Sequence, residues 1–316
     1  MMNEKIHEIN YLKAIFILLM VAFHLSYIGE KYPYAKELVY TFHMSGFLII
    51  SGFLTHIEKR VGRFLRDVGW IAVMYIVAEV PYAIASHFLP VYDALPELSP
   101  LAVARAVFVR PLGPYWYFHT LILCQLLYFL TFRLGRQAGM STFSCLLLLG
   151  SLLFGVSHFL GLTSFSDSLY FLLGAGASLS GLPFTRLFRG SAWAILPLAL
   201  LALFPANFDR GTLAGVAITY LTISLLLYLC GKMRPGWMTR ALDFVGENTL
   251  PILLFSPLFT FLSKKALSLF LFDPTALCFM FVTVLITVGG CIAIAFCLDK
   301  ANISPLLSGR KNLIRK

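Results

Sequence analysis

The chain has 316 residues, of which 59% are hydrophobic and only 13% are charged, and its mean hydropathy is +0.82. Soluble domains carry about 25% charged residues, so this composition excludes an ordinary soluble enzyme. The net charge of +10 does not indicate a nucleic-acid-binding protein, because the basic residues lie in short clusters between apolar runs. The sequence predicts a single integral membrane domain over residues 1–316.

Apolar runs of about 20 residues, the length needed to cross the hydrocarbon core, recur along the chain. They predict an all-α transmembrane bundle of about ten helices, at residues 10–28, 38–56, 68–88, 114–133, 143–161, 167–182, 191–206, 212–231, 247–263 and 275–298. The sixth and seventh runs are short and contain Gly or Pro. The longest polar connection, at 89–113, is predicted to lie outside.

Charge predicts the orientation of this bundle. If the spans alternate from a cytoplasmic N-terminus, 18 of the 25 Lys and Arg residues fall on the cytoplasmic side and 7 on the outer side. This bias follows the positive-inside rule. Both termini are therefore predicted to be cytoplasmic.

Three histidines fall at a similar predicted depth near the outer ends of the first, second and fourth spans: His24, His43 and His119. Ionisable groups are costly inside a bilayer and are functional candidates by default. Two interpretations are open. Three histidines can hold a catalytic zinc ion, or one can act as a base while the others bind a polar substrate. Because no acidic residue at that level is available to orient zinc ligands, we expect no metal site.

Two further residues are candidates in the third and fourth spans. Glu79 lies near the middle of its span, where a carboxylate can orient an imidazole or bind a hydroxyl. Trp116 lies near the outer start of its span, where an aromatic ring can stack on the apolar face of a sugar.

Cations gather at the cytoplasmic ends of the first and third spans. Lys13 and His24 are eleven residues apart, so on a helix they face within about 20° of the same direction and lie about 16 Å apart. Arg60, Arg63 and Arg66 follow one another at three-residue spacing, which places them on one helical face. These cations can anchor helix ends in the headgroups, or they can bind the phosphates of a cytoplasmic donor.

Several segments resemble motifs of the membrane-bound acyltransferase type 3 family, and most of all its fucose-4-O-acetylase-like branch. The run Ile9–Lys13 followed by His24 is similar to the I-D-x-L-R signature of the first helix, with its R/K-x10-H spacing. The other similar segments, in the order of the family, are Phe42-His43-Met44 with Ser51-Gly52-Phe53, the R-x-x-R of the next cytoplasmic loop, Pro114–Phe118 and Gly246–Ile252. Together they cover most of the chain.

The chain departs from these motifs at five positions. They are Asn10 for Asp, Lys13 for Arg, Ser45 for Pro, Leu253 for Tyr and Ser256 for His. The last departure means that a second histidine site near the C-terminus cannot be assumed.

The resemblance implies an O-acyltransferase that moves an acetyl or similar short acyl group from cytoplasmic acetyl-CoA to a hydroxyl of an extracytoplasmic or lipid-linked glycan. The donor is a substrate, and no cofactor is expected to be bound permanently. The expected location is the bacterial cytoplasmic membrane, with the bilayer, the donor and the glycan as partners.

The resemblance also assigns roles to residues. It makes His24 the catalytic residue and places the donor at Lys13 and an R-x-x-R pair, which is either Arg60/Arg63 or Arg63/Arg66. We expect His43 and Glu79 to act with His24, and Trp116 and His119 to bind the sugar. The proton can leave the acceptor during direct transfer, or the acyl group can pass through a transient acyl-histidine.

Two other functions stay open at this stage. A transporter or flippase for a glycan or lipid-linked sugar is one, and Glu79 supports it directly. A catalytically inactive sensor or assembly subunit is the other, because Asn10 and Ser256 replace the usual residues of the family.

Overall fold

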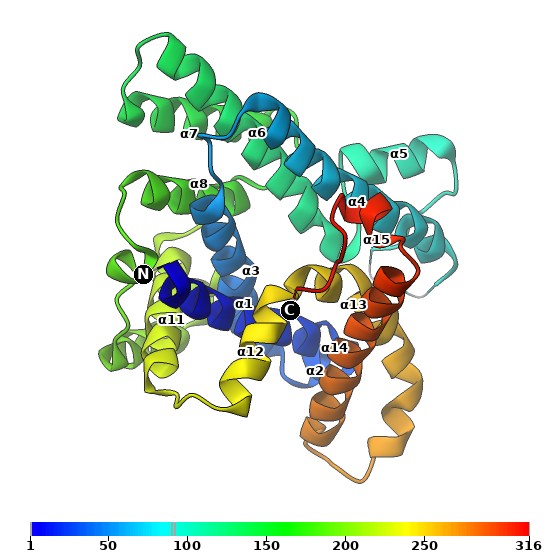
Figure 1. The fold of residues 1–316 in the computed structure, drawn as a ribbon. Helices are drawn as coiled ribbons and strands as arrows, with labels where there is room; N and C mark the ends of the chain where they lie inside the picture. The colour runs from blue at the N-terminus through cyan, green and yellow to red at the C-terminus, as the bar shows by residue number, and fades with distance from the viewer. Residues whose placement is uncertain (1, 90, 92, 316) are drawn as a thin grey trace. The chain divides into compact units, whose positions relative to one another are not determined.

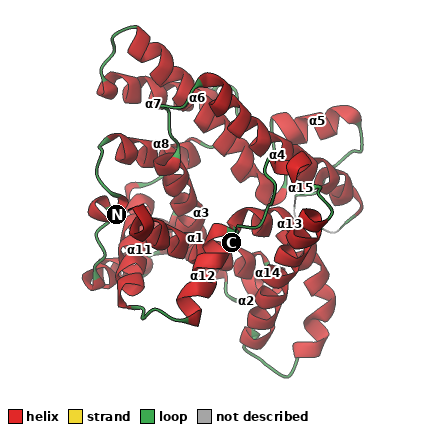
Figure 2. Cartoon of the chain, viewed as in Figure 1, coloured by secondary structure: helices red, strands yellow, loops and turns green. Residues whose placement is uncertain are grey.

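The computed structural model describes residues 2–89, 91 and 93–315. Within them the regular structure is entirely helical, as Figure 2 shows, which confirms the predicted all-α fold class. The chain forms two compact units. Unit 1 contains residues 1–47, 183–304 and 311–316, and unit 2 contains residues 48–182 and 305–310.

Figure 1 traces the helices in chain order. They are α1 (Met2–His24), α2 (Ser26–Lys31), α3 (Pro33–Leu54), α4 (Val61–Phe88), α5 (Pro100–Phe108), α6 (Trp116–Gln137), α7 (Thr142–His158), α8 (Phe165–Leu179), α9 (Phe184–Leu187), α10 (Ile195–Ala202), α11 (Leu213–Lys232), α12 (Trp237–Glu247), α13 (Thr249–Ser263), α14 (Leu277–Lys300) and α15 (Ser304–Ser308). Short 3-10 segments are η1 (Gly113–Tyr115), η2 (Ala192–Ala194), η3 (Pro205–Phe208) and η4 (Lys264–Phe270).

Seven segments of the described chain are long and apolar enough to cross a membrane: His7–His24, Pro33–Leu54, Val61–Phe88, Gly113–Gln137, Leu213–Lys232, Thr249–Phe270 and Leu277–Lys300. They coincide with predicted spans one to four and eight to ten, so the chain is a multi-pass membrane protein. The other three predicted spans hold shorter helices, α7, α8 and α10, of 17, 15 and 8 residues. The cytoplasmic placement of the termini stays a prediction.

The first span ends earlier than the apolar run suggests. At Leu25 the backbone is extended, with φ −70° and ψ 107°, and the short helix α2 follows. His24 is therefore the last residue of α1, whereas we predicted a helix that continues to residue 28. Pro33 then begins α3, a position at which its missing N–H has no helical partner to lose.

Helix α1 lies at the centre of unit 1, where it contacts α11, α12, α13 and α14. Its side chains Leu12, Phe16 and Met20 are buried. The approach of α12 is closest at Gly246, where an added Cβ would lie 2.0 Å from the carbonyl oxygen of Asn10. Only glycine permits this distance, and Figure 1 shows α12 crossing α1.

In unit 2, the last turns of α3 pack directly on α8. A Cβ on Gly52 would lie 2.2 Å from the carbonyl oxygen of Phe171, and one on Gly174 would lie 2.0 Å from that of Ile49. Helices α4 and α6 pack through stacked rings of Phe64 and Phe129, whose centroids are 4.0 Å apart. The glycine of the Ser51-Gly52-Phe53 segment is therefore required for helix packing.

The predicted outer connection contains a helix that the sequence analysis missed. Helix α5 begins with Pro100, and the Ser99 hydroxyl accepts a hydrogen bond of 3.2 Å from the Ala102 amide. Pro at the first position and Ser before it are the usual start of a helix. Helix α5 contacts α4.

The packing of α3 on α8 predicts that Gly52→Ala is destabilising. The methyl group meets backbone rather than a movable side chain, and we expect a loss of about 1–3 kcal/mol. The measurement is the thermal unfolding of the purified protein in detergent. Gly69→Ala on α4 is the control, because a Cβ there meets nothing within 4 Å. Equal midpoints for the two variants would contradict the proposed contact.

Candidate active site

Two of the predicted site histidines lie close together in unit 1. The ring of Tyr40 on α3 has its centroid 5.8 Å from that of His24 and 5.2 Å from that of His43. The Tyr40 hydroxyl donates a hydrogen bond of 3.2 Å to the carbonyl of Phe23, which connects α3 to the end of α1. Sequence analysis missed Tyr40, although its three-residue spacing from His43 was an available signal.

Both imidazoles are oriented by their own helices. Nδ1 of His24 lies 2.7 Å from the carbonyl oxygen of Met20, and Nδ1 of His43 lies 2.7 Å from that of Val39. A carbonyl only accepts, so Nδ1 carries the hydrogen in each ring and Nε2 keeps its lone pair. Within the described residues Nε2 of His43 is buried without a hydrogen-bond partner. His24 is half-buried, so its Nε2 is the more accessible base.

Two cations, Lys36 and Arg210, act on this pair. Nζ of Lys36 lies 5.6 Å from the centroid of the Tyr40 ring. Lys36 interacts electrostatically with His24, and Arg210 does so with His43. Positive charge held near a base can stabilise negative charge that develops on a reacting oxygen.

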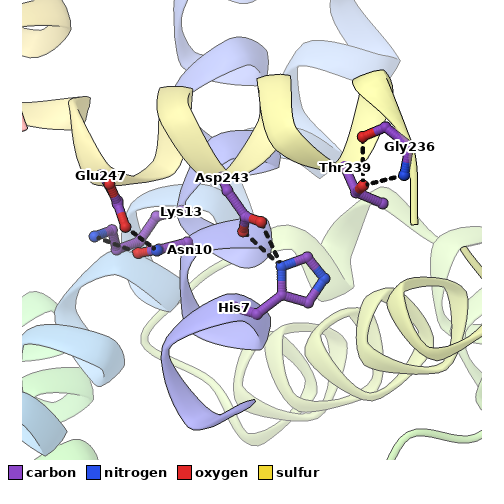
Figure 3. A network of polar contacts seen from close by, with 7 residues as sticks. All are labelled: His7, Asn10, Lys13, Gly236, Thr239, Asp243 and Glu247. Carbon is purple, nitrogen blue, oxygen red and sulfur yellow. Dashed lines mark hydrogen bonds and ion pairs between the residues drawn. The ribbon is translucent and has the colours of Figure 1, made fainter. Parts of the chain in front are cut away.

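A polar network joins α1 to α12 at the other end of α1, as Figure 3 shows. Nδ1 of His7 lies 2.6 and 2.7 Å from the two carboxylate oxygens of Asp243. The Asn10 amide donates to Glu247 Oε1 at 3.2 Å, and Nζ of Lys13 donates to Asn10 Oδ1 at 3.2 Å. Lys13 is thus held by a neutral amide, and among the described residues it forms no ion pair. Its ammonium group is oriented by an amide oxygen rather than by direct contact with a carboxylate.

Helix α12, which carries half of this network, was not predicted. The Gly236 amide donates to the Thr239 hydroxyl at 2.9 Å, which caps the start of the helix (Figure 3). Trp237 and Met238 remain exposed on it. This segment lies between the predicted spans 212–231 and 247–263 and was predicted to be a cytoplasmic connection.

The predicted arginine cluster lies at the start of α4 in unit 2. Arg60 is the N-cap residue and Arg63 and Arg66 lie in the first two turns, so the helix begins well before residue 68, where the third span was predicted to start. Their side chains are exposed and, within the described chain, have no carboxylate partner. The free backbone N–H groups of the helix start add positive potential at the same place.

Neighbouring cations in unit 2 are paired instead. Lys59 lies 2.8 Å from Asp67, and Arg136 lies 2.5 Å from Glu58. Beside the second pair is a hollow of about 280 Å³ lined by Ile57, Glu58, Phe132, Arg133, Arg136 and Gln137. It adjoins the segment that leads to Arg60 and adds a further polar surface there.

Glu79 and His119 both hold the segment that precedes α6. Glu79 Oε1 accepts a hydrogen bond of 2.7 Å from the Leu112 amide, and His119 Nε2 donates to the carbonyl of Phe108 at 3.1 Å. The Tyr75 hydroxyl, which the sequence analysis missed, donates to the carbonyl of Val107 at 2.7 Å. Each of the two predicted residues keeps one buried atom without a described partner, Oε2 of Glu79 and Nδ1 of His119.

Trp116 is the first residue of α6 and is half-buried. Its neighbour Tyr117 has its hydroxyl 2.7 Å from that of Ser51 on α3. This contact joins two of the segments that resemble family motifs. Tyr117 and Ser51 were not singled out from the sequence.

The described residues contain no group of three or more His, Cys, Asp or Glu side chains that could hold a metal ion. His24, His43 and Lys13 belong to unit 1, and Glu79, Trp116, His119 and the three arginines belong to unit 2.

Comparison with protein families identifies the chain. The model of the acyltransferase 3 family, described as an acyltransferase domain, matches residues 6–296. This match confirms the resemblance drawn from the motifs. No curated protein and no solved structure matches the chain.

One carboxylate oxygen of Glu79 accepts a hydrogen bond and the other has no described partner, so we expect two substitutions of Glu79 to have different effects. Glu79→Leu leaves the Leu112 amide without its acceptor, and we expect a loss of about 1–3 kcal/mol in thermal unfolding. Glu79→Gln keeps an acceptor for that amide and replaces the other oxygen with NH₂. We expect near-normal stability and reduced acyl transfer. A Glu79→Gln variant with full activity would show that Glu79 is only structural.

Proposed function

Because the chain belongs to the acyltransferase 3 family of membrane enzymes, we propose that it acetylates a glycan. The acyl donor is cytoplasmic acetyl-CoA, or a close analogue with another short acyl group. The acceptor is a hydroxyl of an extracytoplasmic or lipid-linked glycan. Membership of an acyltransferase family favours this function over a glycan transporter.

The observation that carries the proposal is the state of His24. Its Nδ1–H is engaged by the carbonyl of Met20, and its Nε2 has no hydrogen-bond partner among the described residues. A neutral imidazole with one nitrogen fixed and the other available is the arrangement that general-base catalysis needs. His24 also lies at the end of α1, where the helix gives way to an extended residue.

In the proposed reaction, Nε2 of His24 removes the proton of the acceptor hydroxyl as its oxygen attacks the thioester carbonyl carbon. The new C–O bond forms and the C–S bond breaks. The proton passes from the imidazole to the departing thiolate, which leaves as CoA. In this proposal the cations Lys36 and Arg210, which interact electrostatically with His24 and His43, stabilise the negative charge that develops on the oxygen.

The remaining predicted residues, together with Tyr40, serve the acceptor in this proposal. Tyr40 lies next to both His24 and His43, and His43 is suited to bind a hydroxyl through Nε2. In unit 2, the unpartnered atoms of Glu79 and His119 are suited to sugar hydroxyls, and Trp116 to the apolar face of a sugar.

Donor binding is proposed for Lys13, Arg60, Arg63 and Arg66. The three arginines carry exposed guanidinium groups at a helix start, whereas the neighbouring Lys59 and Arg136 are neutralised by carboxylates. Guanidinium groups bind phosphate oxygens in pairs, which suits the phosphates of CoA.

A two-step route is the alternative at the same residue. Nε2 of His24 would first attack the thioester carbonyl carbon, so that a C–N bond forms, the C–S bond breaks and CoA leaves as the thiolate. The acceptor hydroxyl would then attack the acyl-imidazole, the C–N bond would break, and the hydroxyl proton would pass to the CoA thiolate or to Nε2. The free Nε2 supports this route equally. Rapid mixing with labelled acetyl-CoA in the absence of acceptor distinguishes the two routes. Only the two-step route attaches the label covalently to the protein.

We predict that His24→Ala lowers acetyl transfer by at least about 100-fold, because the base contributes that much or more to proton transfer. Membranes containing the protein are supplied with labelled acetyl-CoA, and label entering the glycan fraction is measured. His158→Ala is the control. His158 is exposed at the end of α7, and its ring stacks on Phe154. Undiminished transfer by His24→Ala overturns the role, and absence of transfer by the unaltered protein overturns the proposed donor.

Single substitutions in the arginine cluster identify the R-x-x-R pair. Arg63→Gln removes a residue common to both registers and should raise the KM for acetyl-CoA about tenfold, through loss of charge-assisted hydrogen bonds. If the pair is Arg60/Arg63, Arg60→Gln should raise the KM equally. If it is Arg63/Arg66, Arg66→Gln should do so.

The control is Lys59→Gln, which removes an equal charge that Asp67 already neutralises. Values of KM for the three arginine variants no higher than that of the control would show that the cluster only anchors the helix in the headgroups.

A further inference from the structure

The segment 313–315 is fastened to unit 1 through its backbone. The amides of Leu313 and Ile314 donate to the two carboxylate oxygens of Asp299 on α14, at 2.7 and 3.2 Å. The amide of Arg315 donates to Asn248 Oδ1 at 2.8 Å, and Asn248 Nδ2 donates back to the Arg315 carbonyl at 3.0 Å. Three successive amides are thus bound by side-chain acceptors, and Asn248 is fully buried.

This fastening places Arg315 in the network around Lys13. Three consecutive residues make the connection. Gly246 touches the backbone of Asn10, Glu247 accepts from the Asn10 amide, and Asn248 binds the backbone of Arg315. Asn10 in turn accepts from Lys13 (Figure 3). Arg315 and Lys13 interact electrostatically.

The arrangement fixes the main chain of Arg315 and leaves its side chain exposed. Two cations are therefore held near each other, while Glu247 supplies one nearby carboxylate. Like charges held together repel, and an anion between them relieves the repulsion. A planar guanidinium beside an ammonium suits a phosphate group well.

We propose that Arg315 is a further donor-binding residue, which contacts a phosphate of CoA beside Lys13, and that Asn248 positions it. This inference rests on the proposed function, because it takes CoA as the donor. It also gives the asparagine of the Gly246–Ile252 segment a specific task. Asn248 acts through the backbone of Arg315 and does not touch the donor.

The test is the affinity of the purified full-length protein, in detergent, for CoA itself. Arg315→Gln should weaken CoA binding about tenfold, because the main-chain contacts of the segment are retained while the guanidinium is lost. Lys311→Gln is the matched control: it removes an equally exposed cation four residues earlier and should stay within about twofold of the unaltered protein.

A double-mutant cycle tests the positioning role. Asn248→Ala should weaken CoA binding as much as Arg315→Gln does, and the double variant should be no weaker than either. In transfer assays the loss should appear in the KM for acetyl-CoA and leave kcat unchanged, which a general loss of folding would not produce. Additive effects of the two substitutions would overturn the positioning role.

The outcomes separate this inference from the proposed function. An Arg315→Gln variant that binds CoA as the unaltered protein does overturns the inference and leaves the acetyl-transfer proposal intact. Unaltered protein that binds CoA but transfers no acetyl overturns the transfer alone. Unaltered protein that does not bind CoA overturns both.

Discussion

The close approach of α12 to α1 at Gly246 and Asn10 is the contact on which much of unit 1 depends. Helix α12 is amphipathic and too short to span, so it is held at α1 by contacts rather than by length. Because a Cβ would meet the Asn10 carbonyl at 2.0 Å, glycine brings the backbones together. Polar side chains on both helices then reach each other, in the pairs His7–Asp243 and Asn10–Glu247. The close backbone contact therefore allows the polar network to form, and the network in turn orients Lys13.

In both histidines the helix backbone alone orients the imidazole ring, without a second side chain. His24 and His43 each donate Nδ1–H to the carbonyl four residues earlier, at the same distance of 2.7 Å. Ring orientation and the position of the hydrogen follow from helical geometry alone, so neither imidazole needs a carboxylate partner to orient it. The two differ in exposure, since His43 is buried and His24 is half-buried. The two imidazoles therefore share a tautomer and differ in solvent access.

Sequence patterns predicted the parts of this protein that depend on local composition. Long apolar runs predicted the seven spans, and three-residue spacing predicted that Arg63 and Arg66 belong to a helix. The break at Leu25 was missed because apolar residues continue through it, so hydropathy carries no signal there. Helix α5 has the usual start of a helix at Ser99-Pro100, but it is too short to appear as an apolar run of spanning length. The contact of Arg315 with Asn248 joins residues far apart in the chain through the backbone, and no side-chain pattern encodes it.

The number of Lys and Arg residues in a cytoplasmic segment says less than which of them have a carboxylate partner. The positive-inside rule treats every Lys and Arg of a cytoplasmic segment alike, since it concerns only transfer across the bilayer. In the described structure Lys59 and Arg136 are matched to carboxylates, whereas the arginines at the start of α4 are not. Guanidinium groups without a carboxylate partner at the positive end of a helix attract phosphate, whether it belongs to a lipid headgroup or to a soluble donor. The pairing pattern therefore singles out these three arginines, rather than Lys59 or Arg136, as candidates for phosphate binding, which the count of charges does not do.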